Sequence, residues 1–349
     1  MASNKHFSYE LAPIPRDRGL ALDGYWVWCG SVIRGEDKRY HLFGSRWRRE
    51  LPFSPNWVTN SEIFRASAGH PEGPFDFEEV VLPDRGPDYW DGMMTHNPTI
   101  HKHGDTYLLY YTGTTYGFDK PDTEHPVSHL QYTEAVRGKR IGLATSKSVY
   151  GPWERRDAPI LDVRPLHWDA SFVSNAAPCV REDGSVLLIY KGNMNCGSHR
   201  PMHLQFMGQA RAAHWSGPYE RDQNAPILKD AYERFLGQED GYCWWNGEYY
   251  SLTGKDMTGG ICGEKHGGFF AWSKDGEDWQ LGEPPLAYSR KVRWEGGGET
   301  MQGQFERVQM LVADGRPVML YAATGDGPGG FDNMTHTRNI AIPLVPSKD

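Results

Sequence analysis

Three copies of the sequence Gly-Pro-aromatic, at Gly73, Gly151 and Gly217, mark the ends of repeated units in this chain. Each unit opens with a strand-like run of apolar and aromatic residues, then has a tight turn and further strand-like runs. One turn is Asn246-Gly247, and an Asn-Gly pair between aromatic runs is a strong hairpin signal because both residues accept a positive φ angle. Self-similarity at a period of roughly 60–80 residues, with about four strands per unit, is typical of a β-propeller.

Five such units follow one another along the chain. Their leading hairpins are expected at 25–45, 96–112, 175–190, 237–252 and 305–321. Residues 339–343 are expected as an outer strand of the last unit, and residues 1–20 as an extended N-terminal arm that closes over the domain. The sequence has no linker or low-complexity tract, so it predicts one all-β domain over residues 1–349. We expect a five-bladed β-propeller with four-stranded antiparallel blades around a central channel; a β-sandwich is the alternative.

Composition agrees with this fold and excludes several classes of function. An aromatic fraction of 13% and 40 glycines suit a β protein rich in turns. The formal net charge of −8 argues against a nucleic-acid partner, which requires clustered Lys and Arg. The five cysteines are widely spaced without a CxxC pair, so we expect neither a disulfide framework nor a metal or other cofactor.

Membrane association is not expected either. No window approaches the ~18 apolar residues of a membrane span, and the N-terminus lacks an apolar run. A cytoplasmic location is therefore predicted, or a secreted or periplasmic one if a signal peptide was removed.

The leading residues of the inner strands are expected to point toward the channel. They are Trp28, His96, Asn97, Asn175, Glu239, Asp240, Glu306 and Arg307, and acidic loops place Asp91 and Asp169 just before the second and third units. Lys191, which follows an inner hairpin, can reach the same space. Convergence of carboxylates, amides and cations at one end of a channel predicts a binding or catalytic pocket.

Neighbouring carboxylates suggest glycoside hydrolysis as the chemistry. One carboxyl of a close pair has a raised pKa and can act as an acid near neutral pH, while the other stays ionised. Glycosidases need this combination across the scissile bond. Each of these residues has a structural alternative, since Glu306-Arg307 can be a buried ion pair and Asp91 and Asp169 can cap turns.

The arrangement resembles the five-bladed-propeller glycoside hydrolases of the arabinanase and β-xylosidase type, family 43. The resemblance rests on the order of the blades and on Glu239, which precedes Tyr249-Tyr250 and the Asn246-Gly247 turn. It implies that Glu239 is the general acid, that the mechanism is typically inverting, and that the substrate is a plant or algal oligosaccharide or polysaccharide. The family's two other acidic positions fall here on Cys29-Gly30 and Asn175.

These departures leave the catalytic base open. It is expected among Asp91, Asp169, Asp240 and Glu306, with Asp23 as a further candidate; His96, Asn97, Asn175 and Arg307 are expected to position the substrate.

Two other functions remain as alternatives. The first is a lyase or dehydratase acting on a uronate-containing oligosaccharide, with His96 or a tyrosine as proton carrier and Arg307 or a lysine neutralising the carboxylate. The second is a non-catalytic sugar-binding propeller. Arg46, Lys191, Lys255 and Arg307 suit an anionic sugar, because Arg binds carboxylate or sulfate through two parallel hydrogen bonds.

Overall fold

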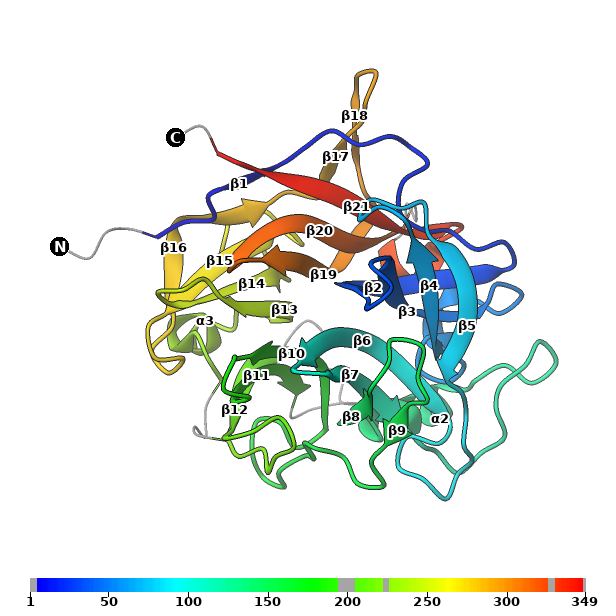
Figure 1. Ribbon diagram of the computed structural model, residues 1–349. Coiled ribbons are helices and arrows are strands. Elements are labelled where there is room, and N and C mark those ends of the chain that lie inside the picture. The colour runs from blue at the N-terminus through cyan, green and yellow to red at the C-terminus, as the bar shows by residue number, and fades with distance from the viewer. Residues whose placement is uncertain (1–4, 194–204, 222–225, 326–329, 348–349) are drawn as a thin grey trace.

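The chain forms a ring of five antiparallel sheets around a central axis (Figure 1). This computed structural model describes residues 5–193, 205–221, 226–325 and 330–347. The predicted five-bladed β-propeller is confirmed.

Each blade runs from an inner strand at the axis to an outer strand at the rim. From inside outward, the first blade is β2 (Tyr25–Arg34), β3 (Tyr40–Arg48), β4 (Glu62–Ala68) and β5 (Asp76–Leu82), and the second is β6 (Met94–His103), β7 (Thr106–Thr114), β8 (Arg140–Ser146) and β9 (Glu154–Arg155). The third is β10 (Phe172–Val180), β11 (Val186–Asn193) and β12 (Phe206–Ala212), where the bridge between Arg211 and Glu220 stands in for a fourth strand. The fourth is β13 (Gln238–Trp245), β14 (Tyr250–Asp256), β15 (Gly268–Ser273) and β16 (Gln280–Tyr288).

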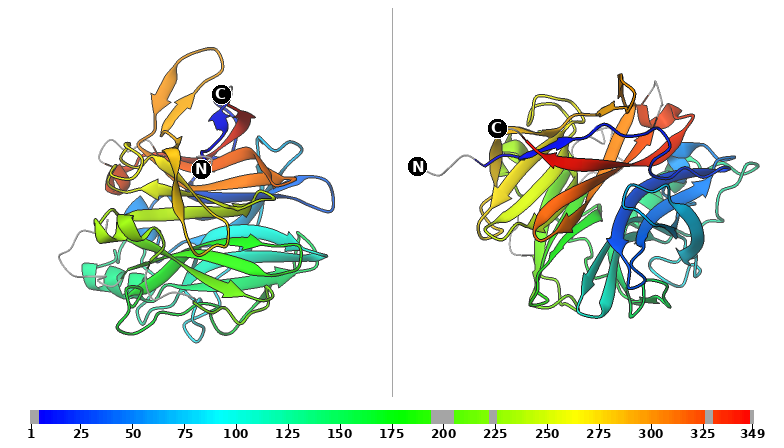
Figure 2. Two further views of the ribbon diagram at one scale, coloured as in Figure 1. Left: turned by 90° about the vertical axis from the view of Figure 1, so that its left-hand side faces the viewer. Right: turned by 45° about the horizontal axis from the view of Figure 1, so that its top comes forward.

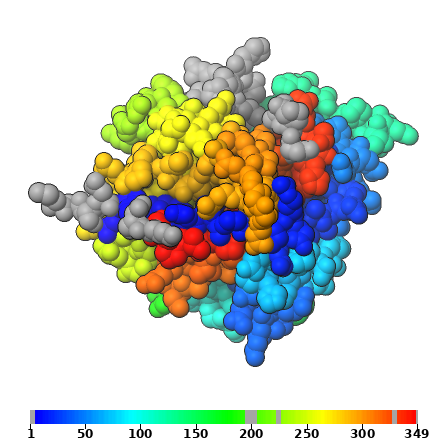
Figure 3. Space-filling view, turned by 90° about the horizontal axis from the view of Figure 1, so that it is seen from above, coloured from blue at the N-terminus to red at the C-terminus, as the bar shows by residue number. Residues whose placement is uncertain are grey.

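The last blade joins the two ends of the chain. It consists of β19 (Gln304–Ala313), β20 (Arg316–Gly325), β21 (Thr337–Pro346) and the N-terminal strand β1 (Tyr9–Leu11). β1 pairs antiparallel with β21, with Tyr9 opposite Pro346 and Leu11 opposite Leu344. Seen from above, the N-terminal arm lies beside this C-terminal strand (Figure 3). The N-terminal strand therefore closes the ring.

All five inner strands have the same irregularity. Each strand shifts register by a β-bulge immediately after its leading residues. At the bulge stands one non-glycine residue with a φ of 50–57°: Cys29, Asn97, Asn175, Asp240 or Arg307. Bulges re-aim side chains, and left-handed non-glycine residues are uncommon outside functional or tightly packed positions. The five bulges place a thiol, two amides, a carboxylate and a guanidinium group at equivalent points around one axis.

Short helices in the connections wall one end of the channel. They are α1 (Phe53–Asn56), α2 (His129–Arg137) and the 3-10 helix η1 (Gly330–Asn333), while α3 (Lys229–Glu233) precedes the fourth blade. α2 begins with a capping box in which Ser128 and Gln131 exchange hydrogen bonds. A hairpin of β17 (Lys291–Arg293) and β18 (Glu299–Met301) projects from the ring (Figure 2). In the described part of the chain, no helix is long and apolar enough to span a membrane.

Candidate active site

A cavity of about 310 Å³ lies at the end of the channel where the inner strands begin. Its lining includes leading residues of four inner strands, namely Trp28, His96, Asn97, Glu239, Asp240, Glu306 and Arg307, together with Asn175 at the bulge of the remaining one. Its walls come from the connections, the second strands and the start of β10: Trp57, Tyr132, Lys139, Phe172, Lys191, Lys255 and Phe331. The predicted pocket is thus present, and seven of its wall residues are aromatic or cationic.

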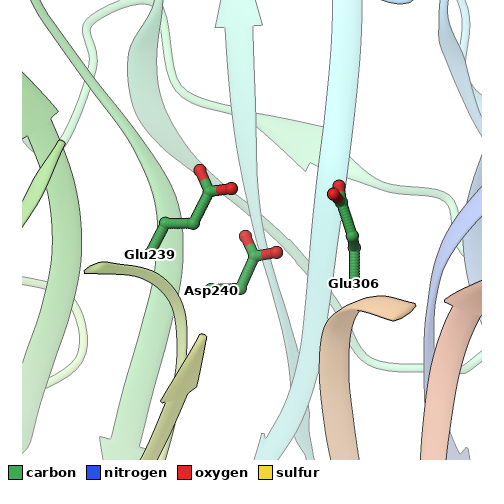
Figure 4. Close-up of side chains that lie close together, drawn as sticks. All are labelled: Glu239, Asp240 and Glu306. Atoms are coloured by element: carbon green, nitrogen blue, oxygen red, sulfur yellow. The ribbon is translucent and has the colours of Figure 1, made fainter. Parts of the chain in front are cut away.

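Three carboxyl groups converge in this cavity. Glu239 and Asp240 come from β13, Glu306 comes from β19, and one oxygen of each lies within 4.8 Å of the others (Figure 4). All three side chains are buried. No other such group of carboxylate, imidazole and thiol ligands occurs among the described residues. This cluster could hold a cation, but an ammonium group already lies within it.

That ammonium group belongs to Lys255 on β14. Its Nζ donates to Glu239 Oε1 at 3.0 Å and to Glu306 Oε1 at 2.5 Å. Lys191 on β11 donates to the other oxygen of Glu239 at 2.7 Å. Glu239 therefore binds two ammonium groups and Glu306 binds one.

This difference separates the pKa values of the two carboxyl groups. Burial alone would raise the pKa of Glu239, but Lys191 and Lys255 outweigh burial and hold that pKa well below its usual range. Burial raises the pKa of Glu306 to about 7, with Lys255 opposing the shift and Asp240 and Glu239 adding to it. Near neutral pH, Glu239 is ionised and Glu306 exchanges its proton. The resemblance implied an acid role for Glu239, whereas Glu306 is the member of this pair with the raised pKa.

Asp240 has a different set of partners. It accepts hydrogen bonds from Asn175 Nδ2 at 2.7 Å and from the backbone N–H of Arg307 at 2.9 Å. Asn175 in turn accepts from Asn97 at 2.5 Å, and Asn97 accepts from the Cys29 thiol at 2.5 Å. The bulge residues of all five blades are thus linked by hydrogen bonds across the axis, and this chain forms the floor of the cavity.

His96 also lines the cavity, but the charges that act on it are positive. Its Nδ1 is 2.8 Å from Ser61 Oγ, and its Nε2 is 4.0 Å from Cys29 Sγ. Burial lowers the pKa of His96 well below its usual value, and the positive charges of Arg307, Lys139 and Lys191 lower it further. The imidazole is therefore neutral at physiological pH, and it can accept a proton only where a negative charge offsets these cations.

Asp91 and Asp169 lie outside this cavity, in two matching structural sites. Asp91 pairs with Arg85 at 2.6 Å and accepts from Tyr111 at 2.6 Å. Asp169 pairs with Arg221 at 2.9 Å and accepts from Tyr190 at 2.8 Å. The preceding Trp90 and Trp168 stack on those tyrosines, with ring centroids 5.8 and 5.7 Å apart.

These contacts explain the repeated Trp-Asp pairs as anchors that hold a loop against a blade. The structure does not bring Asp91 or Asp169 to Glu239, so neither is a candidate for the base. Two other expected residues also lie elsewhere, since Asp23 is exposed and Arg46 pairs with Glu62 at 2.9 Å.

Known proteins resemble this chain in structure but not detectably in sequence family. No model of a protein family matches this sequence, and no curated protein does. Solved structures match over nearly the whole chain. One is Zg3597, a family 117 glycoside hydrolase of the marine bacterium Zobellia galactanivorans, with 15% identity, a TM-score of 0.64, and coverage of 98% of this chain and 91% of that one.

Two further matches have similar quality. The endo-arabinase of Bacteroides thetaiotaomicron has 12% identity and a TM-score of 0.57, with 97% and 99% of the chains covered. The catalytic domain of the Coprinopsis cinerea family 62 α-L-arabinofuranosidase has 11% identity and a TM-score of 0.56, with 97% and 98% covered. The fold is that of five-bladed glycoside hydrolases, and the predicted resemblance at that level is confirmed.

Several wall residues were not predicted from the sequence. Lys139 follows α2, Trp57 follows α1, and Phe331 belongs to η1. These residues come from connections between strands, whereas the repeats in the sequence indicate only the starts of the inner strands. A signal was available for Lys139, because it follows α2, whose Ala135 and Val136 pack against Met94 and Phe172 of the inner strands.

Proposed function

We propose that this protein is a glycoside hydrolase that uses Glu306 as general acid and Glu239 as its ionised partner. The observation that carries the proposal is the shared Lys255 ammonium group, which binds both carboxyl groups while Lys191 binds Glu239 alone. Two carboxyl groups whose pKa values are pushed apart are the usual mark of an acid and its partner.

In this proposal Glu306 donates its proton to the leaving glycosidic oxygen. As that glycosidic bond breaks, Glu239 attacks the anomeric carbon through an oxocarbenium-like transition state and forms a glycosyl ester. Water then displaces Glu239 from the anomeric carbon and returns a proton to Glu306, which completes the hydrolysis. Inverting enzymes keep their two carboxyl groups about 6.5–9.5 Å apart to admit a water molecule, and retaining enzymes about 5–5.5 Å apart. The close approach of Glu239 and Glu306 favours retention, in contrast to the inverting mechanism that the resemblance implied.

The cavity suits a sugar. Trp28, Trp57, Tyr132, Phe172 and Phe331 line its sides, and polar groups converge on its floor. Apolar walls with a few placed polar groups are typical of small-ligand pockets, and 310 Å³ is at the lower end of their range of about 300–1,000 Å³. We propose a plant or algal oligosaccharide or polysaccharide, with an anionic sugar among the candidates, as substrate.

The test is hydrolysis by the variant Glu306→Gln. Pure wild-type protein is screened on plant and algal oligosaccharides, and product masses show whether water has been added. On any substrate found, Glu306→Gln is expected to lower kcat by ~10²-fold or more, the scale of a lost acid group. The control is Glu299→Gln, which removes an exposed carboxylate of the β17–β18 hairpin. Near-full activity of Glu306→Gln, with an unchanged melting temperature, would overturn the assignment.

His96 favours a second candidate, β-elimination from a uronate-containing oligosaccharide. A neutral imidazole among cations can take the proton next to a carboxylate that those cations neutralise. Elimination leaves an unsaturated uronate and adds no water, so the same mass measurement separates the two reactions. A saturated product with the mass of added water would exclude elimination.

A further inference from the structure

The connection between β14 and β15, residues 257–267, reaches the cavity near both of its ends. Met257 at its start and His266 near its end line the cavity, although neither was predicted from the sequence. The connection begins directly after Asp256, the last residue of β14, and the preceding residue, Lys255, binds the carboxyl groups of the proposed acid and its partner. Its conformation therefore determines what this wall of the cavity presents beside those groups.

The buried carboxylate of Asp256 fixes the conformation of this connection. Its Oδ1 accepts from the backbone N–H groups of Thr258 at 3.0 Å and of Gly259 at 2.7 Å. Its Oδ2 accepts from those of Ile261 at 2.7 Å and of Cys262 at 2.9 Å. The residue is 0% exposed, so water does not compete for these charge-assisted hydrogen bonds. Four N–H groups of one loop are thus tied to a single carboxylate, which holds the loop in one conformation.

His266 has a left-handed backbone conformation in this loop. Its φ is 64°, and its N–H donates to the backbone carbonyl of Asp256 at 2.6 Å, while the N–H of Asp256 donates to the carbonyl of Gly267 at 2.9 Å. Glycine adopts such a φ without steric cost, whereas other residues do so uncommonly and gather at functional sites when they do. Backbone geometry alone would favour glycine at position 266, so the presence of an imidazole there indicates a role for the side chain.

The imidazole of His266 is half-buried and makes no hydrogen bond with any residue that the structure describes. The charges of Lys255 and Glu239 both act on it. Burial, with Lys255 as the strongest of the nearby charges, lowers the pKa of His266 to about 4, so the ring is neutral near pH 7. A neutral imidazole has one N–H donor and one bare nitrogen that accepts. This ring therefore presents an unused donor and an unused acceptor at the wall of the cavity.

We infer that His266 is a substrate-binding residue that forms a hydrogen bond with a hydroxyl group of the sugar, and that Asp256 positions it by holding the β14–β15 connection. A sugar hydroxyl both donates and accepts, which matches a ring with one donor and one acceptor. The inference rests on the proposed function in that the ligand is taken to be a sugar. It gives the site a recognition residue that belongs to no inner strand.

The test is a thermodynamic cycle between His266 and the hydroxyl groups of a sugar. Binding of D-galactose, D-glucose and their monodeoxy analogues is measured by calorimetry on the wild-type protein and on His266→Ala. One analogue is expected to bind the wild-type protein roughly three- to tenfold more weakly than its parent sugar, the scale of one hydrogen bond between neutral groups, and to show no such loss with His266→Ala. Equal losses in both proteins for every analogue, or no binding of any of these sugars to the wild-type protein, would overturn the inference.

Further variants separate recognition from a general disturbance of the loop. His266→Gln keeps a donor and an acceptor, and is expected to retain part of the discrimination between parent and analogue that His266→Ala loses. Asp256→Asn replaces one of the two accepting oxygens by a donor, and is expected to weaken sugar binding although His266 is intact. The matched control is His125→Ala, which removes a histidine whose side chain is 79% exposed and should bind sugar as wild type does. Sugar binding by Asp256→Asn that equals wild type would contradict the positioning role.

The outcome is separable from that of the proposed hydrolysis. Calorimetry needs no turnover, and the cycle is repeated on Glu306→Gln. Coupling between His266 and a sugar hydroxyl without hydrolysis of any glycoside would support the inference and refute the proposed function. Hydrolysis by the wild-type protein, with kcat/KM unchanged in His266→Ala, would do the reverse.

Discussion

Glu239 and Glu306 stand at equivalent positions of neighbouring inner strands and accept hydrogen bonds from the same ammonium group, that of Lys255, at 3.0 and 2.5 Å. Each is the residue immediately before the left-handed residue of its bulge. The propeller repeat thus brings together two glutamates that are far apart in the chain. Their different numbers of lysine partners then make them chemically unlike.

The pH dependence of activity follows from this difference. Because Glu306 has a pKa of about 7 and acts in its protonated form, activity is expected to decline as pH rises through 7, by about tenfold per unit well above that value. Measurement of kcat/KM between pH 5 and 9 checks this, since that ratio reports the free enzyme. A constant kcat/KM up to pH 9 would contradict the acid role of Glu306.

Asp91 is expected to serve stability and not catalysis. In Asp91→Asn, the partly buried cations of Arg85 and Arg155 lose the fully buried carboxylate that lies 2.6 and 3.6 Å from them. Removing one partner of a buried ion pair costs roughly 3–5 kcal/mol, and urea unfolding should show a loss of that size. Asp157→Asn is the matched control, because Asp157 pairs with the same Arg85 but its side chain is 84% exposed. That change should cost less than about 1 kcal/mol.

Activity of Asp91→Asn gives the second measurement. Per folded molecule, it should stay close to wild type, because Asp91 lies outside the cavity. A fall in kcat comparable to that of Glu306→Gln, at temperatures where the variant is folded, would restore Asp91 as a catalytic candidate.

Acid should destabilise the fold through its buried histidines. Burial lowers the pKa of His101 to about 4, whereas an unfolded histidine titrates near 6.5. Between these values the unfolded state binds a proton that the folded state does not, so stability falls as pH decreases, by about 1.4 kcal/mol per unit. Urea unfolding at pH 6.5 and 4.5 should show a smaller loss for His101→Gln than for wild type. His125→Gln, at a side chain that is 79% exposed, should behave as wild type.

Much of the fold was accessible from the sequence because local signals repeat. Asn246-Gly247 and the other hairpin turns set the spacing of the inner strands, and the expected strand at 25–33 appears as β2, Tyr25–Arg34. Once the inner strands are aligned, residues at the same distance from the following hairpin turn are equivalent. Cys29 and Asn175 then fall where the family that this chain resembles has acidic residues. Both do stand at the bulges.

The site could be predicted only in part from the sequence. The charge of a side chain and the direction in which it points depend on partners from elsewhere in the chain. Asp91 precedes an inner strand, but Arg155 from the outer strand of the same blade helps to hold it outside the cavity. Likewise, the identity of Glu239 gave no sign that two lysines from other strands keep it ionised. Periodicity reports the strand that carries a residue, whereas pKa depends on contacts in three dimensions.

The chain of hydrogen bonds on the cavity floor explains why an amide stands at position 175. Asn175 donates through Nδ2 to Asp240 and accepts through Oδ1 from Asn97. An aspartate there would lose the donor and bring a second carboxylate against Asp240. We expect Asn175→Asp to cost roughly 1–3 kcal/mol at pH 8, the penalty of leaving a buried acceptor unsatisfied, with like-charge repulsion added.

The cost of Asn175→Asp should shrink at pH 5, because a protonated carboxyl can donate the missing hydrogen bond. Urea unfolding at both pH values measures this, with each variant compared to wild type at the same pH. The control is Asn246→Asp, because Asn246 Oδ1 accepts from the backbone N–H groups of Glu248 and Tyr249 and a carboxylate can do the same. A cost for Asn175→Asp that is equal at both pH values would mean that the charge on the new side chain is not what the floor excludes.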